Sequence, residues 1–519
     1  MSWKPEVDGI EERRRLAKEL GGEASVERQH ALGRLTIRER IAAFADTDSF
    51  REQGSIAGHS ELDESGALHA FTPANYVLGL ARVDGRPVVL GGEDFTQRGG
   101  SPTPSGLRKS VYAEELAVEY QLPLVRFLQG GGGSVMGAKG GKGPRPAGDA
   151  VYATHRFLSI ARAMQTAPVV SAALGAVAGF PAARLVASHL ALMTRESSQV
   201  MVAGPAVVER AIGESLSKNE LGGAAVHARN GVVDLVVEDE AAAITAMRRF
   251  LGYLPTNVHA LPPRAACEDP ADRMEEMLLE VVPRERRKVY SMRKLLAAVV
   301  DRDSFFELGR GYGRSQITGL AHLDGRPVGV WANDPHFYAG AMSARGSRKV
   351  RRFVDLCEAF HLPVVAFVDE PGFMLGAQAE ADATIRFGTE AMFAVVQSTV
   401  PWASVIVRKT YGVAAAAHFA PGALVLAWPS AEGGALPLEG GVAVAFRREI
   451  AAAEDPDALR RELEERLGAA RSPFPRAESF GVHDLIDPRT TRPKLCEWLE
   501  WVQPKLEQHV GLRTHALRP

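Results

Sequence analysis

The sequence predicts an α/β protein built from two tandem copies of one domain. An internal repeat runs through most of the chain, and within each repeat short apolar segments alternate with longer helical ones. The length of 519 residues supports this division, because roughly two to four domain-sized units are expected for such a chain.

The repeat is clearest where GLARVDGRPVVLGGEDFT at 79–96 matches GLAHLDGRPVGVWANDPH at 319–336, an offset of 240. One such match could arise from two unrelated hairpins. Three more matches follow in the same order, pairing 46–54 with 301–309, 122–125 with 362–365 and 168–179 with 401–412. A repeat of this length is too long for a solenoid unit and indicates domain duplication.

The boundary is expected between Pro255 and Lys294, where proline and charged residues are frequent. This predicts an N-terminal domain at 1–258 and a C-terminal domain at 259–519. Within the first, RPVVLGG, LPLVRFLQ and APVVSAAL are typical of strands, whereas SGLRKSVYAEELAVEY and GDAVYATHRFLSIARAMQ are typical of helices. Such alternation predicts a layered α/β fold, with sites at the carboxyl ends of the strands.

Composition excludes several classes of protein. The formal net charge of -2, from 61 basic and 63 acidic residues, provides no field for nucleic acid or an anionic membrane. Cys267, Cys357 and Cys496 are too few and too dispersed for a disulfide framework or a zinc site, so no metal is expected. The N-terminus has no apolar signal segment, and no run of about 18 apolar residues occurs. We expect a cytoplasmic protein that does not span a membrane.

Glycine-rich turns follow three predicted strands, at 129–134, 174–181 and 408–419. Helices that start after such turns direct backbone N–H groups outward, which suits an oxyanion; tight strand-to-helix packing is the alternative. The matched positions of Gly179 and Gly412 in the two repeats favour the oxyanion site. Walker A, Gly-x-Ser-x-Gly and His-Glu-x-x-His motifs are absent from the sequence, which leaves a mechanism based on backbone donors.

The chain also carries a set of family motifs. They include RQHALGRLTIRERI at 28–41, EDFTQRGGS at 93–101, YLPTN at 253–257, FVDEPGFMLG at 367–376, VRKTYG at 407–412 and AWP at 427–429. In order and spacing the chain resembles, over nearly its whole length, the carboxyltransferase (β) subunits of propionyl-CoA and methylcrotonyl-CoA carboxylases, which are biotin-dependent acyl-CoA carboxylases.

The resemblance implies two crotonase-like domains in a homohexamer, with acyl-CoA on the N-terminal domain and carboxybiotin on the C-terminal one. The implied reaction transfers a carboxyl group from carboxybiotin to the α (or vinylogous γ) carbon of the acyl group, with biotin itself accepting the α-proton. The chain has no Met-Lys-Met biotinylation sequence. Biotin and the ATP-binding half are therefore expected on a partner, a biotin carboxylase/biotin carboxyl carrier subunit.

Two segments match the oxyanion motifs of that family. Ala178-Gly179-Phe180 corresponds to an Ala-Gly-Gly turn that faces the thioester oxygen, and Tyr411-Gly412-Val413-Ala414 to a Tyr-Gly-Gly-Ala turn that faces the biotin carbonyl. The resemblance thus places the catalytic backbone donors at Gly179, Phe180, Val413 and Ala414.

Other binding residues follow by the same resemblance. The substrate-binding set comprises Arg98, Gly99, Gly100, Lys109, Gly131, Gly132, Ala178, Ala415 and Ala416. The biotin-binding set comprises Asn333, Asp334, Pro335, Gly372, Phe373, Tyr411 and Gly412. Lys109 would meet a CoA phosphate or be an ordinary solvated lysine. For Asp369 and Glu370 a loop-ordering role is expected, and for His155 and His418 a packed or surface position.

Several positions depart from the family pattern. Phe180 and Val413 replace glycines, so a positive φ at either would be costly. The segment at 130–134 lacks the arginine of the usual SGGAR, and LPLE at 436–439 replaces Met-Gly-Gly-Glu. Ala416 replaces an acid found in acetyl- and propionyl-CoA members, which suggests a bulkier acyl group.

Three alternatives remain open from the sequence. The chain could be the carboxyltransferase subunit of a biotin-dependent acyl-CoA decarboxylase, which runs the same chemistry backwards. It could be a crotonase-type hydratase or isomerase, although such enzymes have a single domain and glutamates in the site. It could also be a non-catalytic scaffold that binds acyl-CoA.

Overall fold

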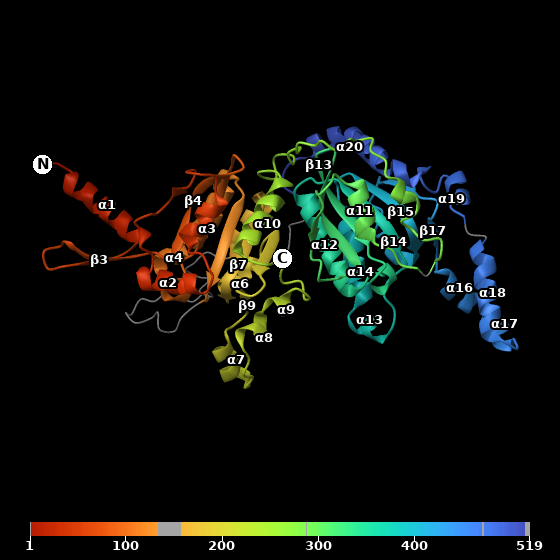
Figure 1. The fold of residues 1–519 in the computed structure, drawn as a ribbon, viewed down its shortest axis with the longest axis horizontal. Coiled ribbons are helices and arrows are strands. Elements are labelled where there is room, and N and C mark those ends of the chain that lie inside the picture. Colours follow the sequence, from red (N-terminus) through yellow and green to blue (C-terminus); the bar gives the residue numbers. More distant parts are fainter. Residues whose placement is uncertain (1, 133–156, 287, 470–471, 514–519) are drawn as a thin grey trace. The chain divides into compact units, whose positions relative to one another are not determined.

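The computed structural model describes residues 2–132, 157–286, 288–469 and 472–513. The chain divides between Ala260 and Leu261 into two compact units, here called unit 1 and unit 2 (Figure 1). In the ranges described, none of the helices combines the length and the apolar character that crossing a membrane requires.

Unit 1 is built on a mixed sheet whose strands lie in the order β1-β4-β5-β6-β7-β8-β10, with β9 paired to β7. The strands are β1 (Arg51–Glu52), β4 (Tyr76–Val83), β5 (Arg86–Glu93), β6 (Leu124–Gly130), β7 (Val169–Ala178), β8 (Leu190–Thr194), β9 (Gln199–Met201) and β10 (Leu235–Val237). β1, β4 and β5 are antiparallel, and the pairs from β5 onward are parallel. All seven residues of β6 are buried, as expected for a central parallel strand.

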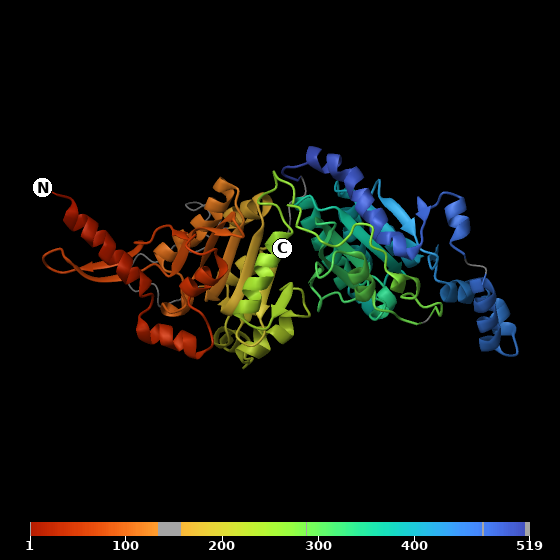
Figure 2. The ribbon, with the colours of Figure 1, turned by 45° about the horizontal axis from the view of Figure 1, so that its top comes forward.

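Helices cover both faces of this sheet (Figures 1 and 2). α4 (Pro104–Tyr120) and α5 (Phe157–Thr166) pack on one face, and α3 (Ile37–Phe44) and α10 (Glu240–Gly252) on the other. Thr103 caps α4 by accepting the Gly106 N–H at 3.0 Å, which explains why this helix starts at Pro104. A separate hairpin of β2 (Gly58–Leu62) and β3 (Leu68–Pro73) contacts α1 (Lys4–Lys18).

Unit 2 repeats the plan with the order β11-β12-β13-β14-β15-β16-β18, and β17 paired to β15. The strands are β11 (Phe306–Leu308), β12 (Gln316–Leu323), β13 (Arg326–Asn333), β14 (Val364–Glu370), β15 (Trp402–Tyr411), β16 (Leu424–Ala427), β17 (Glu432–Gly434) and β18 (Asp484–Leu485). α12 (Ala344–Ala359) and α14 (Thr384–Gln397) pack against each other. α11 (Met292–Val299) and α20 (Thr491–Gln508) form a hydrophobic core together with buried residues of the sheet.

The registers of the two sheets coincide as well. Val89 pairs with Leu124 in unit 1, and Gly329 pairs with Val364 in unit 2, each 240 positions later. Along β7 the offset is 233, because Val169–Ala178 corresponds to Trp402–Tyr411. The predicted tandem α/β architecture is therefore confirmed, strand by strand.

The matching segments at 46–54 and 301–309 have a physical reason. Asp46 accepts the backbone N–H of Gly85 at 2.8 Å, and Asp301 accepts that of Gly325 at 2.8 Å. Each aspartate thereby holds the tight turn between the two long antiparallel strands of its own unit. Such turns need residues that tolerate a positive φ, and Gly85 and Gly325 supply it at 77° and 73°.

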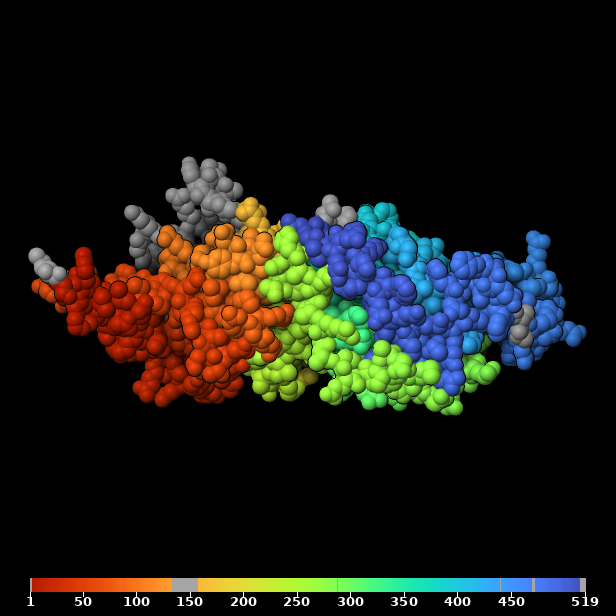
Figure 3. Space-filling view, turned by 90° about the horizontal axis from the view of Figure 1, so that it is seen from above, coloured from red at the N-terminus to blue at the C-terminus, as the bar shows by residue number. Residues whose placement is uncertain are grey.

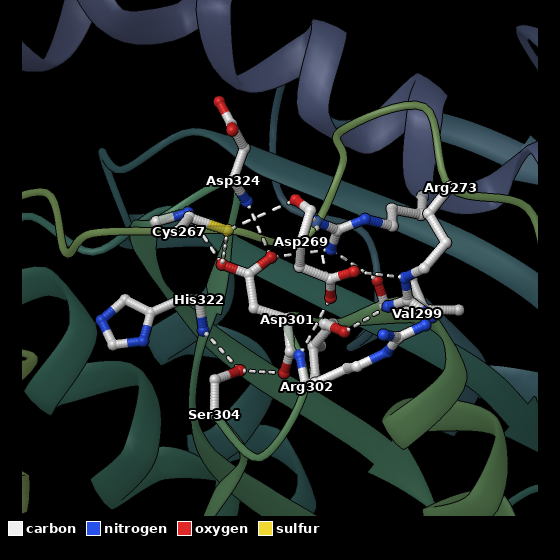
Figure 4. Close-up of polar contacts among 12 residues, drawn as sticks. Cys267, Asp269, Arg273, Val299, Asp301, Arg302, Ser304, His322 and Asp324 are labelled. Carbon is white, nitrogen blue, oxygen red and sulfur yellow. Dashed lines mark hydrogen bonds and ion pairs between the residues drawn. The ribbon is translucent and has the colours of Figure 1, made fainter.

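The segment at the start of unit 2 is anchored to Asp301 (Figure 4). Cys267 Sγ donates to Asp301 Oδ2 at 3.2 Å, and Arg492 of α20 pairs with Asp301 at 2.7 Å and donates to the Pro270 carbonyl at 2.8 Å. Figure 3 shows the blue C-terminal helix beside this green segment on one face of the unit. Burial raises the pKa of the Cys267 thiol, so this cysteine is a protonated structural donor.

The remaining helices lie in connections. They are α2 (Glu23–Ala31), α6 (Phe180–Val186), α7 (Pro205–Ile212), α8 (Lys218–Gly222), α9 (Ala224–His227), α13 (Ala377–Ala381), α15 (Gly412–Ala416), α16 (Leu438–Ala445), α17 (Arg447–Ala452), α18 (Pro456–Ala469), α19 (Phe474–Glu478) and the short 3-10 helices η1 (Arg98–Gly100), η3 (Glu276–Leu279), η4 (Tyr338–Gly340) and η5 (Pro488–Thr490). α16 to α18 form a small cluster of their own around Leu438, Val442, Ile450 and Leu463.

Candidate functional site

In unit 1 the candidate site lies where β7 turns into α6. β7 ends at Ala178, and Gly179 adopts φ 66° and ψ -127° at the N-cap of α6, where no side chain caps the helix. This conformation is cheap only for glycine. The Gly179 N–H donates to the Met201 carbonyl at 3.2 Å, so this predicted donor is engaged within the sheet. Pro181 follows Phe180 and has no N–H to contribute.

Glycines from two other segments lie against this turn. A Cβ on Gly132 would lie 2.8 Å from the Phe180 nitrogen, and a Cβ on Gly100 would lie 2.3 Å from the Gln129 carbonyl oxygen. Only glycine permits these approaches, so η1, the end of β6 and the start of α6 meet backbone to backbone. The structure thus brings the predicted Gly100, Gly132 and Phe180 to one place.

Other predicted substrate residues surround these three positions. Arg98 and Gly99 are exposed on η1, and a Cβ on Gly131 would lie 3.7 Å from Ser101 Oγ. Ser134 and His155 lie outside the described residues. In unit 2, Ala415 is buried and Ala416 is exposed.

The Phe180 side chain packs back onto the helices. Its ring contacts the Phe157 ring edge to face at 5.6 Å between centroids, and the Arg184 guanidinium lies 4.5 Å from its centroid. The positive φ at this turn falls on Gly179, and Phe180 is the first residue of α6. The strain that a bulky residue would suffer at a positive φ is therefore avoided.

In unit 2 the equivalent turn joins β15 to α15. Tyr411 is buried at the end of the strand, and Gly412 adopts φ 63°. A Cβ on Gly412 would meet only the Ala435 carbonyl oxygen, at 3.6 Å, so the space beside this turn is open. Val413 is 62% exposed and Ala414 is buried, and no side chain caps α15. Backbone N–H groups in the first turn of a helix have no partner within the helix.

Asn333 braces the loops around that turn. Its Nδ2 donates to the Gly340 carbonyl at 3.1 Å and to Glu370 Oε2 at 3.0 Å, and its Oδ1 accepts the Asp369 N–H at 3.0 Å. Gly372 follows with φ 125°, and a Cβ there would lie 3.9 Å from the Tyr411 carbonyl oxygen. The structure thus brings three predicted biotin-binding residues, Asn333, Gly372 and Tyr411, together at the carboxyl end of the sheet.

The other predicted biotin residues lie in the supporting loops. Asp334 is buried, pairs with Arg293 and accepts the His336 N–H at 3.1 Å. Pro335 is buried beside it. The Phe373 ring lies against Gly388 of α14, where any Cβ would collide with it. These side chains shape the loops that surround Gly412.

An ion pair that sequence reasoning missed joins the ends of β14 and β15. Asp369 is fully buried and accepts from Arg408 Nη2 at 2.9 Å, from the Tyr290 hydroxyl at 3.0 Å and from the Lys409 N–H at 3.1 Å. The loop-ordering role expected for Asp369 agrees with these contacts. The only signal for its partner was Arg408 within the VRKTYG segment, and the pairing depends on the sheet register.

Lys109 lies away from these turns. It is 8% exposed, its Nζ donates to the Gly54 carbonyl at 3.1 Å, and it lies 3.8 Å from Glu52. Burial lowers its pKa to about 8 against the opposing effect of Glu52. Its counterpart Lys349 donates to the Gly309 carbonyl at 2.9 Å. This duplicated contact supports a structural role for the lysine in each unit.

Comparison with known proteins identifies the family of the chain. Residues 28–516 match the carboxyl transferase domain family. A propionyl-CoA carboxylase carboxyltransferase subunit from Haloferax mediterranei is 33% identical over 517 residues, 97% of each chain. The mitochondrial propionyl-CoA carboxylase beta chain of Homo sapiens is 32% identical, with 98% of this chain and 93% of that one covered. The transcarboxylase 12S crystal structure, a hexamer with methylmalonyl-CoA bound, superposes with a TM-score of 0.86 at 31% identity, covering 99% and 98% of the two chains.

The two crotonase-like domains and the family match define an enzyme that transfers carboxyl groups. The chain belongs to the carboxyl transferase domain family, and it is a carboxyltransferase of the kind that serves biotin-dependent acyl-CoA carboxylases.

Proposed function

We propose that unit 1 binds an acyl-CoA thioester and that unit 2 receives carboxybiotin from a partner, so that the acyl group is carboxylated. The observation that carries this proposal is the pair of equivalent glycine turns, with φ 66° at Gly179 and 63° at Gly412. Each follows a parallel strand and begins a helix with no side-chain cap. Two matched donor sites suit a reaction in which negative charge moves from one oxygen to another.

In unit 1 the thioester oxygen lies at the junction of Gly132 and Phe180. The close backbone approach at Gly132 leaves no side chain between the two segments. Backbone donors fixed in this way need no reorganisation when the enolate develops. Gly179 supplies the conformation of the turn, because its own N–H is bonded to Met201.

In unit 2 the N–H groups of Val413 and Ala414 face the ureido oxygen of biotin. The open space beside Gly412 and the exposed Val413 fit a ring that approaches from outside. Biotin supplies the transferable carboxyl group and a nitrogen that takes the α-proton. The chain supplies the helix N-terminus, whose dipole favours the developing negative charge.

We further propose that biotin and ATP are handled by a biotin carboxylase/biotin carboxyl carrier partner, and that the chain assembles as a homohexamer. The 12S relative is a hexamer that binds methylmalonyl-CoA. Cys267, Cys357 and Cys496 are all free, which suits the reducing cytoplasm.

The test uses purified protein with free biotin and a series of carboxylated thioesters: malonyl-CoA, methylmalonyl-CoA, and longer or branched analogues. Loss of the carboxyl group, followed by mass spectrometry, would demonstrate the half-reaction and identify the acyl group. Binding of every thioester without turnover, also after the biotinylated partner is added, would refute the proposal.

A further inference from the structure

A buried polar pair lies beneath the biotin-side turn of unit 2. Glu370 ends β14 and His418 follows α15, and both are 0% exposed. Glu370 Oε1 accepts the Gly372 N–H at 3.0 Å, and Oε2 lies 3.5 Å from His418 Nε2. One carboxyl group therefore connects the turn after β14 to the segment after α15.

The ring and the carbonyl group of His418 have contacts within unit 2, whereas one ring nitrogen has none. Its ring stacks on the Trp331 ring at 3.8 Å between centroids. Its carbonyl accepts from Trp402 Nε1 at 2.9 Å and from Ser404 Oγ at 2.6 Å. Among the residues that the structure describes, its Nδ1 has no hydrogen-bond partner although it is buried. An unpaired buried nitrogen costs stability, so packing alone does not explain a histidine here.

Protonation of the pair follows from its burial. Burial raises the pKa of Glu370 to about 8 and lowers that of His418 to about 3. Near neutral pH both groups are uncharged, and the protonated carboxyl group donates to His418 Nε2 while Oε1 still accepts the Gly372 N–H. Loss of the carboxyl proton would leave a negative charge in this buried site.

Other charged groups near Glu370 are already paired. Asp369 precedes it on β14 and is bound by Arg408 of β15 and by the Tyr290 hydroxyl. Asn333 of β13 contacts Glu370 with a neutral amide. Within the described chain, no cation is shown pairing with Glu370.

Unit 1 provides an internal comparison. At the places of Glu370 and His418 in the repeat it carries Gly130 and Leu185, and at the place of Trp331 it carries Gly91. Gly179 nevertheless adopts nearly the same φ as Gly412. The fold and the turn therefore do not require the pair, which is specific to the unit proposed to receive biotin.

We propose that Glu370 and His418 are a positioning pair that locks the Gly372 turn against α15 and so shapes the receptor for the ureido ring of biotin. The inference rests on the proposed function. Because neither side chain is exposed, the pair acts through the backbone, at Gly372 through Glu370 and at Ala415 of α15 through the His418 N–H, and its loss should affect biotin more than acyl-CoA.

The test compares Glu370→Ala, Glu370→Gln and His418→Leu in the full chain, with Glu358→Gln as a matched control. Glu358 is also a buried glutamate of unit 2, but it binds the Thr399 N–H at 2.8 Å, away from the turn. KM is measured separately for free biotin and for the carboxylated thioester that the wild type uses. Thermal unfolding checks that each variant is folded, and His418→Leu copies the apolar residue of unit 1.

We expect Glu370→Ala to raise the KM for biotin about tenfold or more, with the thioester KM changed less than about twofold. Glu370→Gln keeps an acceptor for Gly372 and should recover most of the loss. The wild-type KM for biotin should also rise between about pH 7 and pH 9, whereas that of Glu370→Gln should stay flat.

Equal changes in both KM values, or a biotin KM that matches the wild type in folded Glu370→Ala and His418→Leu, would overturn the inference. A biotin KM that still rises between about pH 7 and pH 9 in Glu370→Gln would also overturn the inference. A wild-type protein without any carboxyl transfer would instead reject the proposed function, so the two failures are distinguishable.

Discussion

The substitution Val413→Pro removes one backbone donor from the biotin-side turn while leaving the helix in place. Val413 occupies the first turn of α15, where proline is tolerated because its nitrogen has no partner within the helix. Its side chain is 62% exposed, so the pyrrolidine ring needs no space in the core. Unit 1 already carries Pro181 in the first turn of α6.

The expected loss is that of one oxyanion donor, about 100- to 1,000-fold in kcat or about 3–4 kcal/mol of transition-state stabilisation. Stability should change by less than about 1 kcal/mol, since no intrahelical hydrogen bond is lost. The assay is biotin-dependent decarboxylation of the thioester, with urea unfolding in parallel. Val413→Ala keeps the N–H and is the matched control.

Retention of full activity by Val413→Pro would refute the assignment of this N–H as a donor. An equal loss in Val413→Ala would show that the side chain, not the backbone, matters. Both results can be interpreted only if the variants still unfold cooperatively, and the urea unfolding curves test this.

Three further outcomes are expected. Lys109→Met should lower the free energy of unfolding by about 1–3 kcal/mol, because the Gly54 carbonyl loses its donor. The thioester KM should stay nearly unchanged. A rise in that KM above about tenfold would show that Lys109 binds a phosphate of CoA. Asp301→Asn should cost about 3 kcal/mol in urea unfolding, because the buried Arg492 loses its shorter ion pair and keeps only Asp269 at 3.9 Å. The cost should exceed that of Asp46→Asn, whose ion pair is more exposed, and equal costs would contradict this. Since the folded pKa of Glu370 exceeds its ordinary value of 4.5, the native state binds the extra proton, and the contribution of Glu370 to stability should fall as pH rises from about 4.5 to 8, by on the order of 5 kcal/mol. This fall is measured as the difference in unfolding free energy between wild type and Glu370→Gln, because His418, with its pKa lowered to about 3, contributes the opposite slope in both proteins below about pH 6.5. A difference that does not change with pH would assign the effect elsewhere.

The architecture could be predicted because its signals are local and repeated. The turn between two antiparallel strands needs glycine at a positive φ and an acceptor for its N–H groups. The sequence contains both in each repeat, as Asp46 with Gly85 and as Asp301 with Gly325. Strand burial follows from apolar runs such as β6. These constraints act over short stretches of chain, so the sequence displays them.

Much of the site could not be predicted, because it depends on register between strands. Arg408 reaches Asp369 only when β14 and β15 pair as they do, with Val364 beside Trp402. The burial of Lys109 depends on a loop 55 residues away. A lysine near a glycine-rich segment carries no local mark that distinguishes a phosphate ligand from a structural donor.

The two units keep the same turn and differ in what supports it. Beneath α6, Arg126 is buried, pairs with Glu114 at 3.2 Å and donates to the Arg184 carbonyl at 2.7 Å. Beneath α15 lie the uncharged Glu370 and His418, at the positions that Gly130 and Leu185 occupy in unit 1. A duplicated donor site can diverge in this way without strain, because the backbone geometry is set by one glycine while the layer below sets rigidity and local charge. Selectivity between a thioester and a ureido ring is therefore expected to respond to changes in these buried layers, even where no exposed residue is altered.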